Sequence, residues 1–451
     1  MLQLQTSFED REQYVSYLRA TFATAAARSP EISPIPGGRV AALKRLAQID
    51  PARYGASRNM LDGAVTHLSP YLRHGLLSLA EVRRELLKLD QGEKAHKLLQ
   101  ELAWRDYYQR VYARLGEGIW KDIEGYKTGI ASYRSELPAE ISSGTTGLVC
   151  IDSFARDLRE NGYLHNHARM WTAAYVVHHR RVRWQAGARW FLQHLLDGDP
   201  ASNNLSWQWV ASTFAAKPYY FNQENLAHYT EGTYCQRCPL NEQGCPFAGS
   251  YDTLAKRLFG DQQTTENRAL DASPLSVQLT GMEERPEQDT EPPHTTQEQV
   301  LIWIHDECLH SPALTAHPDA QAIFVFDEEA LEKAEWSLKR IAFLYESLLE
   351  IPHIQIYSGS PVEILTTLQR QISEQTGQIV TIATMSAVSP YLRLQMRELE
   401  QSAPLSRYPV EAFAPIPSIQ DLRRFSRYWN RAQQAVFSHT DLKRQEWKLG
   451  R

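Results

Sequence analysis

Residues 190–209 read WFLQHLLDGDPASNNLSWQW, and this stretch decides how the N-terminal part of the chain folds. An apolar segment with helical spacing leads into Asp197 and Asp199. The Pro, Ser and Asn residues that follow favour a helix cap, so a second helix begins there and carries Trp207 and Trp209. Taken alone, the stretch is explained equally well by a capped helix with two core indoles and by one wall of a binding site.

Composition favours an intracellular globular protein of two domains. The chain has 451 residues, of which 43% are hydrophobic, and this is enough for a sizeable core. No apolar run reaches the roughly 18 residues that a membrane span needs, and the start, MLQLQTSFEDREQ, lacks the pattern of a signal peptide. We therefore expect a cytoplasmic protein with no membrane partner. Five cysteines in such a chain indicate metal or redox chemistry and not a disulfide framework.

Hydrophobic spacing divides the chain into three parts. Residues 1–260 have mainly helical periodicity. Residues 261–299 are poor in aromatic residues and rich in Gln, Thr, Glu and Pro, which predicts a flexible linker. Residues 300–451 predict a Rossmann-like parallel α/β domain that ends in an amphipathic helix at 418–437, because helical segments alternate with short apolar runs at 300–305, 322–327, 354–359 and 379–384.

Two observations limit the classes of function. The chain has no GxGxxG motif and no P-loop, so a dinucleotide or nucleoside triphosphate site is not supported. Residues 1–260 carry 31 Lys and Arg against 26 Asp and Glu. Solvated helical surfaces show the same small excess, so charge alone does not predict a nucleic acid partner.

Further motifs identify a family. The segments GLVCIDSFARDLRENGYLHNHARMW (147–171) and RWQAGARWFLQHLLDGDPASNNLSWQWVAS (183–212) resemble the FAD-binding domain of the DNA photolyase and cryptochrome family. YGASRNMLDGAVTHLSPYLRHGLLS (54–78) is similar to its flavin phosphate loop, and ELAWRDYYQR (101–110) to its substrate-facing helix. These segments occur in the family's order across residues 50–215.

The resemblance implies a changed domain order. The family normally begins with an α/β antenna domain, whereas here residues 301–331 resemble the opening strand, loop and second strand of that domain. The implied fold is an all-helical FAD-binding photolyase-like domain followed by the Rossmann-like domain, in a circularly permuted order. His305, Asp306 and Glu307 replace the charged motif expected after the first strand, so the antenna chromophore stays unknown.

The resemblance also implies which residues hold FAD. An Arg in an apolar helix needs a carboxylate partner if it is buried, and Arg169 is implied to pair with Asp197. Asp197 and Asp199 are implied to contact the ribityl and isoalloxazine region, with Asn166 in the same pocket. Asn203 is implied to face flavin N5, where a neutral amide can serve a nitrogen whose protonation changes with redox state. The positions implied for the flavin phosphates are Tyr54, Thr66, Leu68 and Ser69.

Within the family, the tryptophans take separate roles. Trp207 matches the electron relay nearest the flavin, and Trp184 matches the second relay. With Asn203 they are the residues assigned to the photochemistry. A third relay is not identified, and Trp120 is only a candidate. Core packing is the simpler explanation for Trp120, Trp171 and Trp190.

Five residues match the family's positions that contact a pyrimidine dimer in DNA. Trp104 and Trp209 match the aromatic pair that flanks the flipped dimer, as aromatics stack extruded bases. Asn166 stands where the branch that repairs (6-4) photoproducts has His, which argues against that substrate. His167 stands where many dimer photolyases carry Arg, which removes a permanent positive charge. The full set of dimer positions is Glu101, Trp104, Asn166, Met170 and Trp209.

The cysteines form a second motif. Cys235, Cys238 and Cys245 have the spacing C-x2-C-x6-C, and Cys150 lies upstream. In isolation, the group fits a partial zinc site or unbridged core thiols. The resemblance implies instead the 4Fe-4S cluster of a bacterial branch of the family, held by all four thiolates, although the last spacing is shorter than in that branch. Cys308 is expected in the core of the α/β domain.

The favoured function is that of a deoxyribodipyrimidine photolyase-like lyase, which transfers an electron from reduced FAD to cyclobutane pyrimidine dimers in DNA under blue light. The alternative is a cryptochrome-like blue-light photoreceptor without repair activity, whose signalling partner is unknown. A light-independent flavin or cluster redox protein is a third possibility. The dimer-contacting residues favour repair, whereas His167, the domain order and the weak positive charge favour a receptor.

Overall fold

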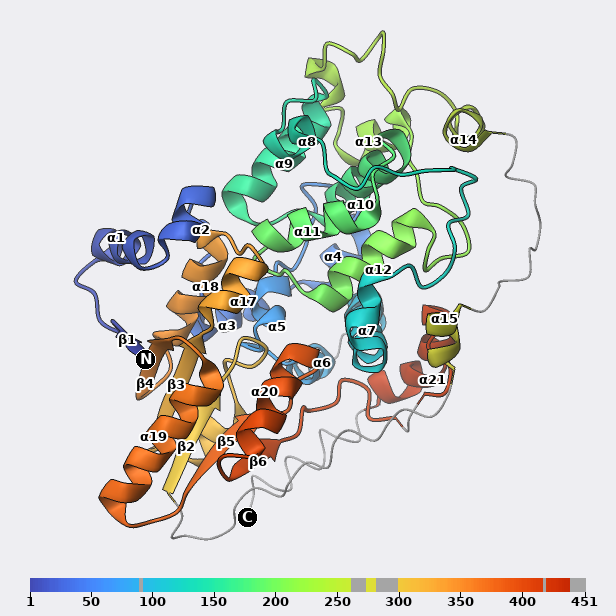
Figure 1. Cartoon of the computed structure of the whole chain (residues 1–451). Coiled ribbons are helices and arrows are strands. Elements are labelled where there is room, and N and C mark those ends of the chain that lie inside the picture. The colour runs from blue at the N-terminus through green and yellow to red at the C-terminus, as the bar shows by residue number, and fades with distance from the viewer. Residues whose placement is uncertain (89–91, 261–272, 281–298, 417–418, 439–451) are drawn as a thin grey trace. The chain divides into compact units, whose positions relative to one another are not determined.

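The computed structural model describes residues 1–88, 92–260, 273–280, 299–416 and 419–438 (Figure 1). Contacts divide the chain into two compact units. The sheet unit comprises Met1–Gln48, His67–Arg83 and Glu284–Phe413. The helical unit comprises Ile49–Thr66, Arg84–Glu283 and Ala414–Arg451. No helix in the described parts of the chain is long and apolar enough to cross a membrane.

The sheet unit is built on one six-stranded sheet with the order β1-β4-β3-β2-β5-β6. All neighbouring strands are parallel except β1 and β4. The apolar runs predicted as strands correspond to β2–β5, so the prediction of a parallel α/β fold is confirmed. The strands are β1 (Leu2–Leu4), β2 (Gln299–Ile304), β3 (Gln321–Phe326), β4 (Ile354–Ser358), β5 (Val380–Met385) and β6 (Leu405–Tyr408). The helices are α1 (Arg11–Thr21), α2 (Ala23–Arg28), α3 (Arg39–Ala47), α5 (Ser69–Arg73), α16 (Pro312–Ala316), α17 (Glu328–Lys333), α18 (Leu338–Leu348), α19 (Pro361–Thr376) and α20 (Pro390–Glu400).

Strand β3 shows why its run of apolar residues is continuous. Ile323 and Val325 face a core that includes apolar residues of α19 and α20. Phe326 points the other way and packs against Phe22 and Tyr345, with ring centroids 5.0 and 5.7 Å away. Because alternate residues of a strand point to opposite faces, a strand covered by helices on both sides needs apolar residues at every position.

The N-terminal residues belong to the sheet unit, which differs from the expected boundary of 1–260. Strand β1 pairs antiparallel with β4, with Leu2 opposite Ser358. The hydroxyl of Tyr14 donates a hydrogen bond to the carbonyl of Ala342 at 2.7 Å. Such pairing between distant parts of the chain leaves no local signal in a three-residue strand, so periodicity alone assigned these residues to the helical part.

The helical unit contains no β-strand among its described residues, as predicted. It also includes residues 414–416 and 419–438, which were expected in the α/β domain. Part of the expected linker is folded as α15, and Leu279 beside it is fully buried. Residues 261–272 and 281–298 of that linker lie outside the described residues. The α-helices are α4 (Pro51–Ser57), α7 (Gly92–Leu115), α8 (Ala139–Ser143), α9 (Val149–Asn161), α10 (Asn166–Ala174), α11 (Trp184–His194), α12 (Pro200–Ala211), α13 (Gln223–Tyr229), α14 (Tyr251–Phe259), α15 (Pro274–Gln278) and α21 (Phe425–Val436). The unit also contains two 3-10 helices and one π-helix: η1 (Gly116–Trp120), η3 (Cys235–Arg237) and η2 (Tyr175–His179). Helix α6 (Leu79–Lys88) crosses the boundary between the two units.

Candidate functional site

The turn between α11 and α12 has the capped geometry that the sequence predicts. Asp199 is the N-cap of α12, and Pro200 occupies the first helical position. The Asp199 carboxylate accepts hydrogen bonds from the backbone N–H groups of Ala201 and Ser202 at 3.3 and 3.2 Å, and from the Ser202 hydroxyl at 2.6 Å. The cap therefore fixes a buried carboxylate at the start of the helix that carries the two indoles.

Asp197 lies in the same turn and is paired with Arg169 of α10, as expected. The Arg169 Nη2 atom is 2.8 Å from Asp197 Oδ2, and Asp197 is only 7% exposed. The second carboxylate oxygen, Oδ1, is buried and has no hydrogen-bond partner among the described residues. Buried polar atoms are nearly always satisfied, so an orphaned carboxylate oxygen fits a position at which a bound molecule donates a hydrogen bond.

Helix α7 reaches the same turn from the other side. Arg105 Nη1 lies 3.4 Å from Asp199 Oδ2, and Gln109 Nε2 donates to the same oxygen at 2.8 Å. Sequence reasoning missed both residues. Their spacing could have revealed them, because Glu101, Arg105 and Gln109 are separated by four positions and so share one face of the helix.

The side chain of Asn203 is held in one orientation. Its Nδ2 group donates to the carbonyl of Ala188 at 3.0 Å and to Oδ1 of Asn204 at 3.1 Å. An amide nitrogen has two hydrogens, and both are used here. The side-chain oxygen is therefore the atom of Asn203 with which a ligand would interact, as an acceptor.

The four residues assigned to the flavin phosphates are divided between the two units. Tyr54 and Thr66 belong to the helical unit, whereas Leu68 and Ser69 belong to the sheet unit, at the start of α5. The structure therefore does not bring the four together within one unit. Tyr54 of α4 is buried, and burial raises the pKa of its hydroxyl. The nearby negative charge of Glu101 raises this pKa further.

The dimer-contacting candidates lie on three helices of the helical unit. Glu101 forms ion pairs with Arg58 at 3.0 Å and with Lys97 at 2.9 Å, so its charge is compensated. Asn166 is exposed, and its Nδ2 group lies 3.4 Å from the sulfur of Met170 one turn along α10.

The two indoles of this set are both half-buried. Trp209 of α12 packs on Tyr219, with ring centroids 5.4 Å apart. Trp104 of α7 stacks on Phe425, which sequence reasoning did not identify, at 3.8 Å. Tyr107 and Tyr108 also lie beside Trp104, with ring centroids 5.9 and 5.5 Å away, and part of the surface of each indole is accessible.

His167 turns away from the exposed end of α10. Its Nδ1–H donates to the carbonyl of Asn59 at 2.8 Å, and its ring stacks between Trp171 and Tyr229. Burial lowers the pKa of His167, so the imidazole is neutral at neutral pH. This position therefore supplies no positive charge.

The tryptophans assigned to electron relay are deeply buried. Trp207 is 2% exposed and contacts Phe191 edge-on, with ring centroids 5.0 Å apart. Trp184 is fully buried, and its indole N–H donates to Asp122 at 2.6 Å. Trp120, for which core packing was the simpler explanation, is half-buried and stacks on Trp184 at 6.5 Å. Trp171 and Trp190 lie in the core, as expected.

Gly187→Ala is expected to displace Trp207. A Cβ atom on Gly187 of α11 would lie 2.2 Å from Cη2 of that indole. The ring is enclosed, so the helices must shift, which costs about 1–3 kcal/mol of unfolding free energy. Photoreduction of bound FAD should slow if the ring moves. Chemical denaturation and the photoreduction rate measure these effects. Gly125→Ala is the control, because a Cβ atom there meets nothing within 4 Å. Equal behaviour of the two variants would contradict the close packing of Gly187.

The four cysteines of the second motif line one small cavity of about 10 Å³ in the helical unit. Burial raises the pKa of the Cys150, Cys235 and Cys245 thiols, and their neighbouring sulfurs raise it further, so a bound cation is needed to keep them as thiolates at neutral pH. The described residues contain no group of three His, Cys, Asp or Glu side chains close enough to hold a metal ion.

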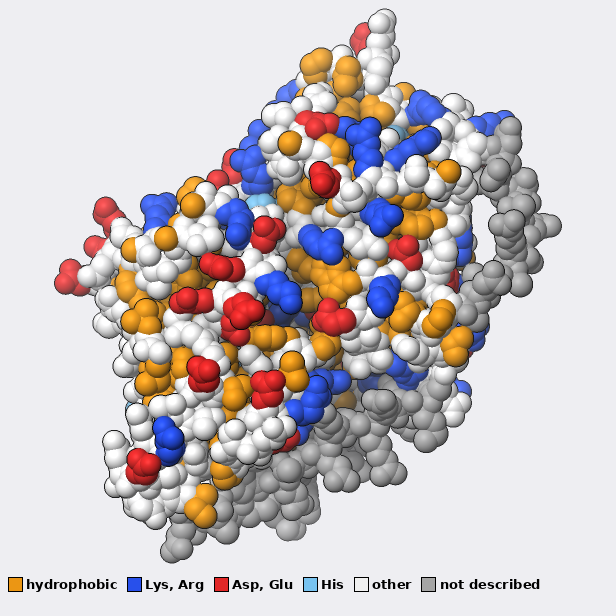
Figure 2. Space-filling view, viewed as in Figure 1, with side chains coloured by type: hydrophobic (Ala, Val, Ile, Leu, Met, Phe, Trp, Pro, Cys, Tyr) orange, Lys and Arg blue, Asp and Glu red, His pale blue; other side chains and the backbone are white. Residues whose placement is uncertain are grey.

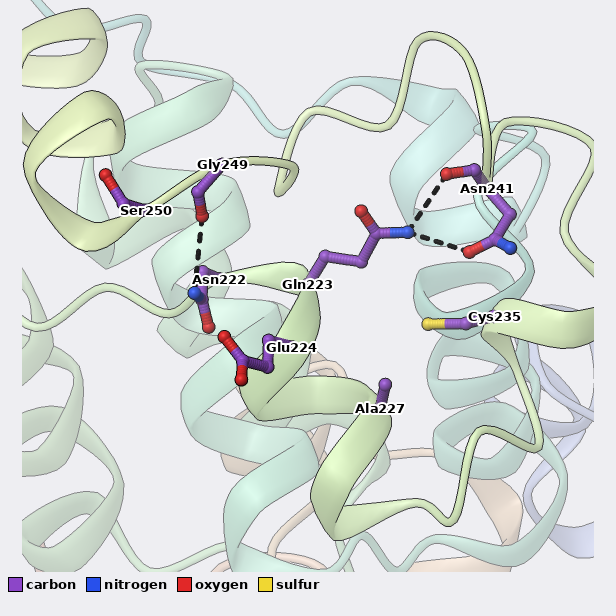
Figure 3. Close-up of a pocket in the computed structure, with 8 residues that line it drawn as sticks. All are labelled: Asn222, Gln223, Glu224, Ala227, Cys235, Asn241, Gly249 and Ser250. Atoms are coloured by element: carbon purple, nitrogen blue, oxygen red, sulfur yellow. Dashed lines mark hydrogen bonds between the residues drawn. The ribbon is translucent and has the colours of Figure 1, made fainter.

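A larger pocket of about 510 Å³ lies beside the cysteine cavity (Figure 3). Cys235, Gln223 and Asn241 line both spaces. Gln223 Nε2 donates to the backbone and side-chain oxygens of Asn241 at 3.0 and 2.7 Å. This amide pair is therefore part of a wall between the thiols and an open pocket.

The residues that follow β2 lie at the carboxyl ends of β2 and β5, the neighbouring strands between which the strand order of the sheet reverses. His305 Nε2–H donates to the carbonyl of Met385, at the end of β5, at 2.9 Å. Glu307 accepts hydrogen bonds from the backbone N–H groups of Val388 and Ser389, at the start of α20, at 2.8 and 3.2 Å. Such an edge is where α/β folds bind ligands, and here a carboxylate of the chain takes the helix N-terminus.

Comparison with known proteins gives a family match within the helical unit. Residues 98–235 match a protein family described as the FAD binding domain of DNA photolyase. This part of the chain is thus similar to the photolyase and cryptochrome family and contains most of the site described above.

Individual relatives are photolyases. The deoxyribodipyrimidine photo-lyase of Streptomyces griseus is 40% identical over 151 residues, which cover 33% of this chain and 32% of the relative. That of Alkalihalophilus pseudofirmus is 33% identical over 192 residues, covering 41% of this chain and 40% of the relative. A cryptochrome structure from Synechocystis is 27% identical, with 45% of this chain and 46% of that chain covered and a TM-score of 0.41. The chain spans well under half the length of the curated relatives it matches.

Proposed function

We propose that this protein binds FAD in the helical unit and uses light to split cyclobutane pyrimidine dimers in DNA. The observation that carries the proposal is the Arg169–Asp197 pair, in which the carboxylate is buried and its Oδ1 atom has no hydrogen-bond partner among the described residues. It lies in a segment similar to the FAD-binding domain of photolyases, and the named relatives are deoxyribodipyrimidine photo-lyases.

The residues of the α11–α12 turn suit a flavin. When bound, FAD supplies the light-driven donation and return of one electron. In this proposal Asp197 Oδ1 accepts a hydrogen bond from the cofactor, and the Arg169 guanidinium stabilises its negative charge in the reduced form. Both hydrogens of the Asn203 amide are engaged, so its side-chain oxygen is the group that faces the cofactor. This oxygen would accept a hydrogen bond from a protonated ring nitrogen of the flavin. Tyr54, Thr66 and Asn166 complete the proposed cofactor set within the helical unit.

Electrons for reduction of the flavin would pass along the buried indoles. We assign Trp207 as the first relay and Trp184 as the second. Trp120 is the best candidate for the third, since it is parallel to Trp184 within 12° and is half-buried. Arg189, which is exposed, lies over the Trp120 ring at 5.0 Å, so this indole is near the surface.

The proposed DNA site is formed by Glu101, Trp104, Asn166, Met170 and Trp209. The indoles would stack on the flipped bases, which is sequence-tolerant recognition typical of unpaired nucleotides. Figure 2 shows Lys and Arg side chains around a hydrophobic area over the helical unit. Lys and Arg side chains on such a surface could contact the DNA phosphates, and the hydrophobic area between them could receive the flipped bases.

A cryptochrome-like photoreceptor without repair activity is the second candidate. The orientation of His167 favours it, because the half-buried imidazole, whose pKa is lowered by partial burial, offers no permanent charge to a lesion or to the DNA backbone. This candidate shares the flavin and the relay with the first. The two differ in whether dimers in DNA are lost under light.

We also propose that Cys150, Cys235, Cys238 and Cys245 hold a 4Fe-4S cluster. The support is that all four thiols line one cavity in the helical unit. Four Cys thiolates are the usual protein ligands of such a cluster, which would supply one-electron redox chemistry there.

The domain order completes the proposal. Most of the sheet unit follows the helical unit in the chain, which supports a circularly permuted arrangement of the two photolyase domains. Strand β1 and its following helices are an N-terminal part of the sheet unit that a simple exchange of two domains does not include.

The test of the whole proposal is light-dependent loss of dimers from an oligonucleotide in the presence of the purified protein.

A further inference from the structure

The C-terminal helix α21 is fixed to α7 within the helical unit (Figure 1). Arg424, its N-cap residue, forms two hydrogen bonds with the buried carboxylate of Glu124, at 2.6 and 3.0 Å. One turn further, the hydroxyl of Tyr428 donates to Asp106 of α7 at 2.6 Å. Bidentate Arg–carboxylate pairs are geometrically specific, so the position between these two anchors is well defined.

Phe425 lies between those anchors and covers one face of Trp104. The two ring centroids are 3.8 Å apart, and the ring planes differ by 9°. At this distance the rings are in van der Waals contact, so no other ring can stack on that face. Tyr107 approaches Trp104 and Phe425 edge-on, at 5.9 and 5.7 Å. The indole is thus restrained by the C-terminal segment of the chain.

We propose that Phe425 is a positioning residue for the dimer site: it holds Trp104 so that the part of the indole that stays accessible stacks on a flipped base. This inference rests on the proposed function. Immobilising a side chain before binding removes an entropic cost that would otherwise fall on the complex. The DNA site on α7 is therefore completed by a residue that follows the whole sheet unit in the sequence.

The test is the affinity of the full-length holoprotein for an oligonucleotide with one thymine dimer, relative to the undamaged oligonucleotide. Phe425→Ala should weaken binding of the dimer by about three- to tenfold, which is the factor expected for one freed side chain. The rate of light-driven repair at saturating DNA should change by a smaller factor than the affinity, because the described ring contacts of Phe425 include no residue proposed for the flavin or the relay. Phe425→Tyr should restore the affinity, since it keeps the stacked ring.

Phe437→Ala is the matched control, because Phe437 stacks on His96 near the other end of α21 and makes no described contact with Trp104. Unchanged dimer affinity in Phe425→Ala, or a loss equal to that in Phe437→Ala, would overturn the positioning role. Tighter binding in Phe425→Ala would also overturn it, because α21 would then be covering the face that the base needs. If the unaltered protein does not prefer the dimer, the proposed function itself fails, and the inference with it.

Discussion

Arg169→Ala is expected to destabilise the helical unit by about 2–4 kcal/mol, because it leaves the Asp197 carboxylate charged and buried without a partner. Removing one partner of a fully buried ion pair usually costs about 3–5 kcal/mol of unfolding free energy. We expect a smaller loss here, because the Arg169 side chain is 25% exposed. The guanidinium also donates from Nε to the Leu164 carbonyl at 2.9 Å, so the entry to α10 loses a second contact. We further expect most of the bound FAD to be lost, because the variant lacks the only positive charge assigned to the reduced flavin.

Urea denaturation and the ratio of FAD to protein in purified material measure the two effects of Arg169→Ala. Arg180→Ala is a matched control, because Arg180 pairs with Glu140, which is 42% exposed. Exposed ion pairs contribute about 0–1 kcal/mol, so this variant should keep both its stability and its flavin. Full FAD occupancy in Arg169→Ala would contradict the assignment of this pair to the cofactor, whatever happens to stability.

If the proposed 4Fe-4S cluster is present, Cys238→Ser is expected to remove its iron and the broad brown absorbance that it gives the purified protein. Serine lacks the soft thiolate that the cluster requires, and a cluster with three protein ligands is exposed to loss. Folding should be affected less than iron binding, because Cys238 is only half-buried. Iron and sulfide analysis, together with the visible spectrum after anaerobic purification, measures the effect.

Cys308→Ser provides the control for Cys238→Ser. Cys308 is buried in the sheet unit, where its sulfur lies 3.1 Å from that of Met385, and it has no place in the cysteine cavity. This variant should keep the iron of the unaltered protein. Retention of iron and sulfide in Cys238→Ser would show that the ligand assignment is wrong. Zinc in place of iron in the unaltered protein would contradict the cluster itself.

Sequence patterns predicted the helix caps and most of the strands, because these structures depend on residues that are close together in the sequence. The cap at Asp199 follows from the order of polar residues in the turn, and β2–β5 follow from short apolar runs between helices. The short strands β1 and β6 were not predicted, since strands of three and four residues show no clear alternation. The position of residues 1–48 depends on pairing with β4, which no local pattern reveals.

The same distinction applies to the candidate site. The pairing of Arg169 with Asp197 was expected from the need of a buried charge for a partner, and the structure contains it. Arg105 could also have been found, from its spacing to Glu101 on one face of α7. Phe425 could not, because its stacking on Trp104 joins positions 104 and 425 through tertiary packing alone.

The central claim is that the protein repairs cyclobutane pyrimidine dimers with light, and it is tested most directly by one assay. Purified protein with reduced FAD is mixed with an oligonucleotide that carries one thymine dimer, and dimer content is followed under blue light and in the dark. We predict dimer loss in the light only, with more than one dimer repaired per protein molecule. Photoreduction of FAD without any loss of dimer above the dark control would contradict the claim and favour the photoreceptor.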